Sequence, residues 1–287
     1  MNPGDEVLYP NPGYPIYESQ INYQGGVALP YRYNQTKSGF DIDLDNLANS
    51  ISSKTKILIL NNYQNPMSAS SSKEELKALS KLVLKHDLWV LSDDAYYEIR
   101  YSKDSPNSIL NFPGMKQRTV ILYTFSKKYA MTGWRIGASI GPESLIKHMA
   151  RFNINDESCT NHFIQHALAS VLNESNDYGE EIIKKLIKRR NLCLKKLNSI
   201  SDLNISTPDS TFYLFPNVSK VMRKKGYDNL EKFRVDALKN TGVSFCTREH
   251  FGTPFSNEKG QYIRFAYSGI TRKDISEGLD KFINWIN

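Results

Sequence analysis

Two apolar runs separated by an amphipathic segment constrain the fold of this chain more than any other feature. The first, Lys56 to Leu60, is hydrophobic over nearly its whole length, which is typical of a strand buried on both faces of a parallel sheet. Before the second run, Leu88 to Leu91, Ser72 and Glu75 form a capping-box pattern that predicts a helix start. The apolar positions of this helix recur at helical spacing: Leu76, Leu79 and Val83. The sequence therefore predicts a strand–helix–strand unit with parallel strands, and an α/β fold.

A candidate reactive lysine follows a third apolar run. Lys127 comes just after residues 119–123, so it should emerge at the C-terminal end of a strand, the edge where open α/β sheets bind ligands. A lysine there can form a Schiff base with an aldehyde cofactor. Thr124, Ser126 and Arg135 could hold a phosphate group through hydroxyl donors and a two-pronged guanidinium. The same spacing is also found in basic surface loops after strands. Other parts of the chain must therefore decide between a cofactor-binding lysine and a surface lysine.

Asn65 and Asp93 follow the two runs of the strand–helix–strand unit, so they should reach the same sheet edge as the lysine. A carboxylate there could bind a cationic N–H group of a ligand, and Asn65 and Tyr96 could donate hydrogen bonds to it. Arg264, near the C-terminus, could bind a substrate carboxylate. Each residue alone also has an ordinary explanation: turn chemistry for Asn65, a helix cap for Asp93 and a surface charge for Arg264.

The composition excludes several classes of function. With 287 residues, 40% of them hydrophobic and 23% charged, the chain can bury the core of one large or two smaller domains. The net charge of +7 is moderate, and the basic cluster at residues 184–190 is interpreted as a solvated helix face, so no nucleic-acid partner is expected.

No apolar run approaches the roughly 18 to 20 residues of a membrane span. Three cysteines without a CxxC pair predict reduced, mostly buried thiols, no metal site and a cytoplasmic protein: Cys159, Cys193 and Cys246.

The remaining elements are expected from hydrophobic periodicity. Strands are predicted at residues 6–9, 136–140, 211–215, 243–246 and 262–267, and helices from about 15 and at 44–51, 143–152, 161–172, 180–197, 229–239 and 272–286. The helix at 180–197 is strongly amphipathic, which suits a connector between two lobes. We therefore expect a large domain at 1–182 and a small α+β domain at 183–287.

The segment Thr124 to Arg135 resembles the cofactor-lysine motif of class I and II aminotransferases, which use pyridoxal 5'-phosphate. The likeness, to the aspartate and aromatic aminotransferase branch, extends from Gly4-Asp5-Glu6 to the last helix. It implies catalytic roles for three residues: Lys127, Asp93 and Tyr96. It implies cofactor contacts from these three and from Tyr14, whose ring would cover the cofactor, Asn65, Thr124, Ser126 and Arg135. It implies substrate contacts from Asn65 and Arg264.

The resemblance also implies a fold and a reaction. The fold is fold type I, a large domain around a mostly parallel seven-stranded sheet with a small C-terminal domain, assembled as a homodimer. The reaction is ping-pong transfer of an amino group between an L-amino acid and a 2-oxo acid through a pyridoxal phosphate Schiff base. Two alternatives stay open: a pyridoxal phosphate-dependent C–S β-lyase, and a catalytically impaired cofactor-binding remnant. The sequence does not select the amino donor and acceptor.

This chain departs from the family pattern at several points. The usual Asn-Pro-Thr-Gly is Asn65 to Ser68 here, and Asp94 stands where the family has glutamate. Family members also carry, before Gly4, a segment whose helix start binds the phosphate. Its absence predicts loose cofactor binding and an exposed apolar patch on the sheet. Lys128, one position beyond the candidate lysine, is expected to point into solvent.

Overall fold

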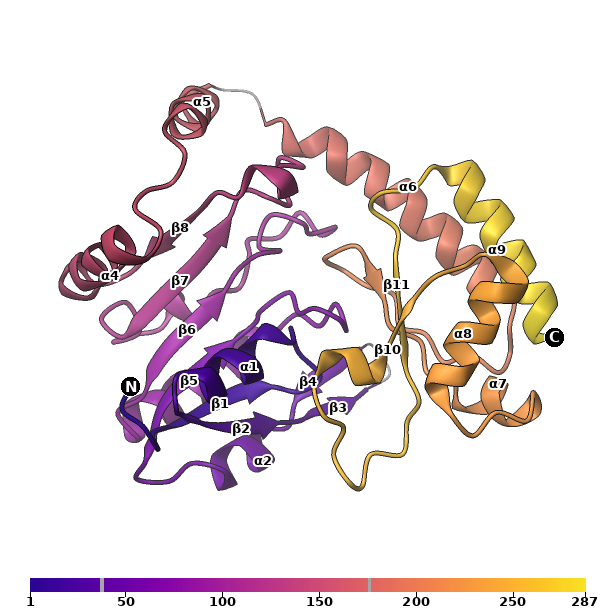
Figure 1. Cartoon of the computed structure of the whole chain (residues 1–287), viewed down its shortest axis with the longest axis horizontal. Helices are drawn as coiled ribbons and strands as arrows, with labels where there is room; N and C mark the ends of the chain where they lie inside the picture. Colours follow the sequence, from indigo (N-terminus) through magenta and orange to yellow (C-terminus); the bar gives the residue numbers. More distant parts are fainter. Residues whose placement is uncertain (37–38, 175–176) are drawn as a thin grey trace.

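A six-stranded sheet organises the larger lobe of this chain, seen in a computed structural model that describes residues 1–36, 39–174 and 177–287 (Figure 1). The strand order is β2-β1-β5-β6-β7-β8, and every neighbouring pair is parallel except β7 and β8. The strands span Glu6–Pro10 (β1), Val27–Tyr31 (β2), Thr55–Leu60 (β5), Trp89–Asp93 (β6), Thr119–Thr124 (β7) and Gly137–Ile140 (β8). The predicted α/β class is confirmed, while the expected seven strands are wrong: the described part of this sheet has six.

Period-two alternation along the central strands fills a core on both faces of the sheet. Leu8 and Leu58 point to the face covered by α2 (Leu44–Asn49) and α3 (Lys73–Lys85), whereas Val7 and Ile59 point to the face covered by α1 (Ile16–Tyr23). The predicted apolar stripe of α3 is fully buried: Leu76, Leu79 and Val83. The Ser72 hydroxyl accepts a hydrogen bond from the Glu75 amide and caps that helix, as predicted.

One edge of the large lobe carries the long crossover into the small lobe. After β8 the chain forms three helices, α4 (Glu143–Asp156), α5 (His162–Leu172) and α6 (Gly179–Leu197), all three predicted from periodicity. All four residues of β8 are exposed, and α4 has no buried residue. Exposed apolar side chains lie at this end of the large lobe: Ile140 of β8, Phe152 and Ile154 of α4, and Phe163 of α5.

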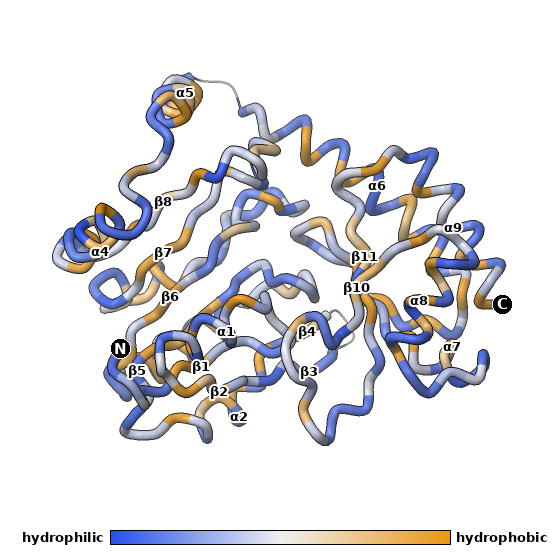
Figure 2. The backbone as a smooth tube through the Cα atoms, in the orientation of Figure 1, coloured by the Kyte–Doolittle hydropathy of each residue, from blue (hydrophilic) through white to orange (hydrophobic). Residues whose placement is uncertain are grey.

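The small lobe packs helices against a three-stranded antiparallel sheet of order β10-β11-β9. Its elements are β9 (Tyr213–Leu214), α7 (Ser219–Lys224), α8 (Leu230–Thr241), β10 (Cys246–Thr247), β11 (Ile263–Ala266) and α9 (Arg272–Ile286). Along α6 and α9 the colour alternates between hydrophilic and hydrophobic residues (Figure 2), and their apolar faces meet in one core with β9 and β11. The predicted α+β character is confirmed, although β9 and β10 are shorter than expected.

Several elements were not predicted from the sequence, and one expectation was wrong. Strand β2 was not predicted because Pro30 interrupts its pattern; it lies at the edge of the sheet, where a missing N–H donor is tolerated. The hairpin of β3 (Tyr33–Gln35) and β4 (Phe40–Ile42), and helix α7, were also missed. The expectation of mostly buried thiols is wrong, because Cys193 is buried but Cys159 is exposed and Cys246 is only partly buried. Among the described residues, no helix is long and apolar enough to cross a membrane.

A buried arginine joins the two lobes. Arg248, 2% exposed, follows β10 in the small lobe and forms a two-pronged pair with Glu258, with N–O distances of 2.7 and 2.9 Å. Its second terminal nitrogen also donates to Asn11 Oδ1 of the large lobe at 2.8 Å. The Asn11 side chain in turn donates to the carbonyl of Thr253 at 2.7 Å. The loop after β1 is therefore clamped to the small lobe.

Replacing Arg248 by Met should destabilise the protein by about 3 to 5 kcal/mol, because it leaves the Glu258 carboxylate without its buried partner. Arg234→Met is the matched control: Arg234 also binds a glutamate, Glu231, through two nitrogens, but on the exposed face of α8. Its loss should cost less than about 1 kcal/mol. Urea unfolding of the three proteins tests this, and equal losses in the two variants would contradict the assigned role.

Candidate active site

Lys127 lies in the turn that leaves β7, where the sequence placed it. Its side chain is partly buried, and its amine lies 5.6 Å from the ring centroid of Tyr96. Burial, followed by the nearby positive charges of Arg135 and Arg264, lowers the pKa of Lys127, while the carboxylate of Asp93 opposes this shift. The site thus favours the unprotonated, nucleophilic amine more than water does.

Asp93 is the last residue of β6 and lies within electrostatic range of this lysine. The Tyr17 hydroxyl donates to its Oδ2 at 2.5 Å, and the Ala95 amide donates to Oδ1 at 3.2 Å. Burial raises the pKa of Asp93, and the Tyr17 and Ala95 hydrogen bonds and Lys127 act in the opposite direction. A cationic N–H group beside this partly buried side chain would favour its charged carboxylate form.

Lys128, adjacent to the candidate lysine, does not point into solvent as the sequence suggested. Its side chain is only 17% exposed, and its amine lies 3.6 Å from Glu98 and 3.5 Å from Asp177. These carboxylates raise the pKa of Lys128 despite its partial burial. The expectation failed because the chain leaves β7 through a turn, so strand alternation no longer applies. Lys128 remains a charged ammonium group in an ion-pair network.

The three predicted phosphate ligands surround the same turn. The Thr124 hydroxyl donates to the Ser126 hydroxyl at 2.9 Å and accepts from the Ser126 amide at 3.2 Å. Arg135, with a left-handed backbone (φ 52°), closes the short 3-10 helix Thr132–Trp134 and is exposed. Its guanidinium donates to the carbonyl of Thr132 at 2.9 Å. Two hydroxyls and one guanidinium are thus available beside Lys127.

Arg264 of β11 reaches across from the small lobe to the large one. It donates to Asn65 Oδ1 at 2.8 Å, and its guanidinium carbon lies 4.3 and 4.7 Å from the ring centroids of Tyr213 and Phe251. Its Nε is buried and has no hydrogen-bond partner among the residues that the structure describes. A partly buried guanidinium with an unused donor is suited to a carboxylate ligand.

The two predicted tyrosines occupy different environments. The Tyr96 hydroxyl forms a hydrogen bond of 2.5 Å with the Tyr213 hydroxyl, in which either group can be the donor. Tyr14 is 47% exposed and meets Tyr17 edge-on, with ring centroids 5.9 Å apart. Its loop is the one that Arg248 clamps. The Tyr14 ring therefore lies next to the hydrogen-bond partner of Asp93.

The sequence reasoning missed three supporting residues. Tyr17 donates to the Asp93 carboxylate, Asn61 donates to the Asp93 carbonyl at 2.9 Å, and Tyr213 contacts both Tyr96 and Arg264. The spacing of Tyr14 and Tyr17 at the start of a helix carried a weak signal, since both fall near the same face. No signal in the sequence pairs Tyr213 with Tyr96, because the two residues come from different lobes.

These side chains have the chemistry that pyridoxal phosphate requires. They provide an amine with a lowered pKa, a partly buried carboxylate suited to the ring nitrogen, hydroxyl and guanidinium donors suited to a phosphate, and an arginine with an unused buried donor. All lie at one edge of the sheet or face it from the small lobe. The residues present fit this group.

Comparison with known proteins identifies the family to which this chain belongs. The family model described as "Aminotransferase class I and II" matches residues 1–282, so this chain belongs to that family. Its members depend on pyridoxal phosphate and transfer amino groups between amino acids and oxo acids.

Individual relatives agree with this assignment. The chain is similar to the asparagine–oxo-acid transaminase of Streptococcus mutans, with 31% identity over 99% of this chain and 71% of that protein. It is also similar to the aspartate aminotransferase of Sulfolobus acidocaldarius, with 30% identity over 100% of this chain and 70% of that protein. The crystal structure of an aromatic aminotransferase from Pyrococcus horikoshii matches with a TM-score of 0.90 at 30% identity, over 100% of this chain and 74% of that one. The fold is therefore that of the fold type I transferases.

Asp94, next to Asp93, should make stability depend on pH. Burial raises the pKa of Asp94 to about 7 from 3.8, the Ser92 hydroxyl opposes the shift, and the charge of Asp93 increases it. Because the folded state binds this proton more tightly, the contribution to stability is complete below about pH 4 and is lost as the pH rises through 7. Compared with Asp94→Asn, the native protein should lose on the order of 3 kcal/mol between pH 4 and pH 8.

Urea unfolding of the cofactor-free proteins at pH 4, 6 and 8 measures this difference. Asp45→Asn, at an exposed position of α2, is the control and should leave the pH profile unchanged. Parallel profiles for the native protein and Asp94→Asn would show that Asp94 titrates normally.

Proposed function

We propose that Lys127, Asp93 and Arg264 carry amino-group transfer between an L-amino acid and a 2-oxo acid in this chain. The observation that supports this most strongly is the set of charges around one amine. Lys127 has a lowered pKa and is influenced both by Asp93 of the large lobe and by Arg264 of the small lobe. A nucleophilic amine, an acid and a carboxylate-binding cation are thus gathered at the sheet edge where α/β enzymes place their chemistry.

When bound, pyridoxal phosphate supplies the electron sink for the reaction. Lys127 would hold its aldehyde carbon and, once displaced by the substrate amine, would move the proton of the substrate Cα. Asp93 would keep the proton on the ring nitrogen, and the Tyr17 hydrogen bond fixes the orientation of the carboxylate. Thr124, Ser126 and Arg135 would bind the phosphate.

The substrate would be held from both lobes. Arg264 would bind the α-carboxylate with the nitrogen that is buried and lacks a partner among the described residues, while Asn65 fixes the guanidinium. Asn65 and Tyr96 would contact the cofactor ring, and Tyr14 would cover it. The names of the relatives support an aspartate, asparagine or aromatic amino acid as donor.

The assembly proposed for this chain follows the family. We divide it into a large domain at 1–182 and a small domain at 183–287, with the boundary inside α6. We propose a cytoplasmic homodimer. The exposed apolar side chains on β8, α4 and α5 support a further protein surface over that end of the sheet.

Borohydride reduction of the protein loaded with pyridoxal phosphate should attach the cofactor covalently to Lys127. The amine of Lys127 is poised to lose its proton, whereas Lys128 is held as an ammonium group by Glu98 and Asp177. Peptide mass spectrometry locates the label. Lys128→Ala should be labelled like the native protein and Lys127→Ala should not. Label on Lys128 in the native protein would refute the assignment.

Arg264→Lys should lower kcat/KM for every amino acid substrate by a similar factor, of about tenfold or more. Lysine keeps the charge but loses the two-pronged geometry, and the α-carboxylate is common to all these substrates. Kinetics with aspartate, asparagine and phenylalanine provide the measurement. A loss confined to aspartate would instead make Arg264 a selector of the substrate side chain.

A further inference from the structure

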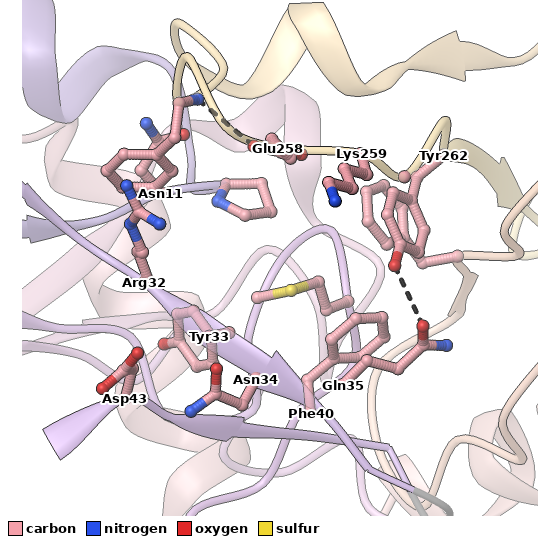
Figure 3. A pocket seen from close by; sticks show the side chains of 15 residues that line it. Asn11, Arg32, Tyr33, Asn34, Gln35, Phe40, Asp43, Glu258, Lys259 and Tyr262 are labelled. Atoms are coloured by element: carbon pink, nitrogen blue, oxygen red, sulfur yellow. Dashed lines mark hydrogen bonds between the residues drawn. The ribbon is translucent and has the colours of Figure 1, made fainter. Parts of the chain in front are cut away.

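A second pocket, separate from Lys127, lies where the two lobes meet. One wall comes from the segment around β3 and β4 of the large lobe and the other from the loop before β11, as Figure 3 shows. Its volume is about 230 Å³. This is below the roughly 300 to 1,000 Å³ of most ligand pockets, so it suits a molecule no larger than one ring with a short side chain.

The pocket has an apolar, aromatic wall. Tyr262 stacks on Phe215 with ring centroids 5.1 Å apart and an interplanar angle of 5°, and Phe40 meets both rings edge-on. The Tyr262 hydroxyl donates to Gln35 at 2.9 Å across the lobe boundary, which fixes this wall in place (Figure 3). The thioether of Met67 also lines the space. These groups favour an apolar or aromatic ligand body.

Two cations that line the pocket have no ion pair among the described residues. Arg32 lies with its guanidinium carbon 4.1 Å from the ring centroid of Phe255, and its Nε is buried with no hydrogen-bond partner in the part of the chain that the structure describes. Lys259 is exposed, and in Figure 3 its amine points into the pocket. An unused buried donor on one wall and an open ammonium group on the other are recognition elements for an anion.

The acidic side chains at this pocket have other partners. Both carboxylate oxygens of Glu258 accept from Arg248, and Asp43 accepts from the Asn46 amide as the cap of α2. Neither carboxylate forms an ion pair with Arg32 or Lys259 within the described chain. The local excess of charge that a ligand would meet is therefore positive.

We propose that this pocket binds a small monocarboxylate with an aromatic or apolar body, at a site distinct from the one around Lys127. The carboxylate meets Arg32 and Lys259, and the body lies against Phe40, Phe215 and Tyr262. Because Arg32 belongs to the large lobe and Lys259 to the small lobe, the bound molecule connects the two. The site is independent of the proposed transfer reaction.

Isothermal titration of the cofactor-free protein with 3-phenylpropionate tests the proposal. Arg264→Met serves as the background, because it removes the other carboxylate-binding arginine. On that background binding should persist, and adding Lys259→Met or Arg32→Met should each weaken it by about tenfold or more. The neutral amide of the same acid should also bind at least about tenfold more weakly, whereas Lys81→Met, at an exposed lysine of α3, should change nothing.

Loss of all binding in Arg264→Met alone would overturn the proposal, as would an unchanged isotherm in Lys259→Met and Arg32→Met. Circular dichroism checks the fold of each variant. If Arg32→Met does not fold, because Arg32 stacks on Phe255, the exposed Lys259→Met and the amide decide the question. Equal affinity for acid and amide would show that Arg32 has only a structural role.

Discussion

The alignment of the parallel strands β5, β6 and β7 determines where every chemical group of the candidate site can lie. Leu60 pairs with Ser92 and Asp93 with Leu122, so the three strands end at nearly the same level. A slip of one residue would move buried apolar side chains such as Leu58 and Val90 from their packing against α3 to the opposite face of the sheet. The apolar core therefore positions Asp93 and the turn that carries Lys127, although neither residue contributes to that core. Function at this edge depends on hydrophobic packing elsewhere in the sheet.

Polar groups buried at this edge lose hydration, and the surrounding hydrogen bonds offset that loss. Asp93 accepts from Tyr17 and from the Ala95 amide, and its carbonyl accepts from Asn61. Burial nevertheless dominates, since it raises the pKa of Asp93 and lowers that of Lys127. Both shifts favour the neutral forms in the protein alone. A cationic ring nitrogen would restore the charge of the acid, while the lysine amine is already disposed to react. The same burial thus prepares the acid and the amine for different tasks.

Local patterns predicted what depends on local physics. The apolar runs gave the positions of β5, β6 and β7, the capping pattern gave α3, and the strand ends gave Asp93 and the Lys127 turn. The errors arose where contacts between distant segments of the chain determine the position of a side chain. Lys128 was misplaced because its partner Glu98 comes from elsewhere in the chain, and the Tyr96–Tyr213 hydrogen bond joins the two lobes. The edge position of β2 allowed a proline that a single-sequence pattern counts against a strand.

Two arginines of the small lobe, Arg248 and Arg264, contact the large lobe in the same way but have different surroundings. Arg248 and Arg264 each donate to an asparagine that precedes a proline in the large lobe, Asn11 and Asn65. Arg248 also has both oxygens of Glu258, so its charge is neutralised and every contact is internal. Arg264 has aromatic rings on its faces, a buried nitrogen without a hydrogen-bond partner, and no ion pair among the described residues. A buried charge without a counter-ion is costly unless a ligand supplies one. A single glutamate, present beside Arg248 and absent beside Arg264 among the described residues, therefore separates the structural clamp from the arginine that we propose to bind a carboxylate.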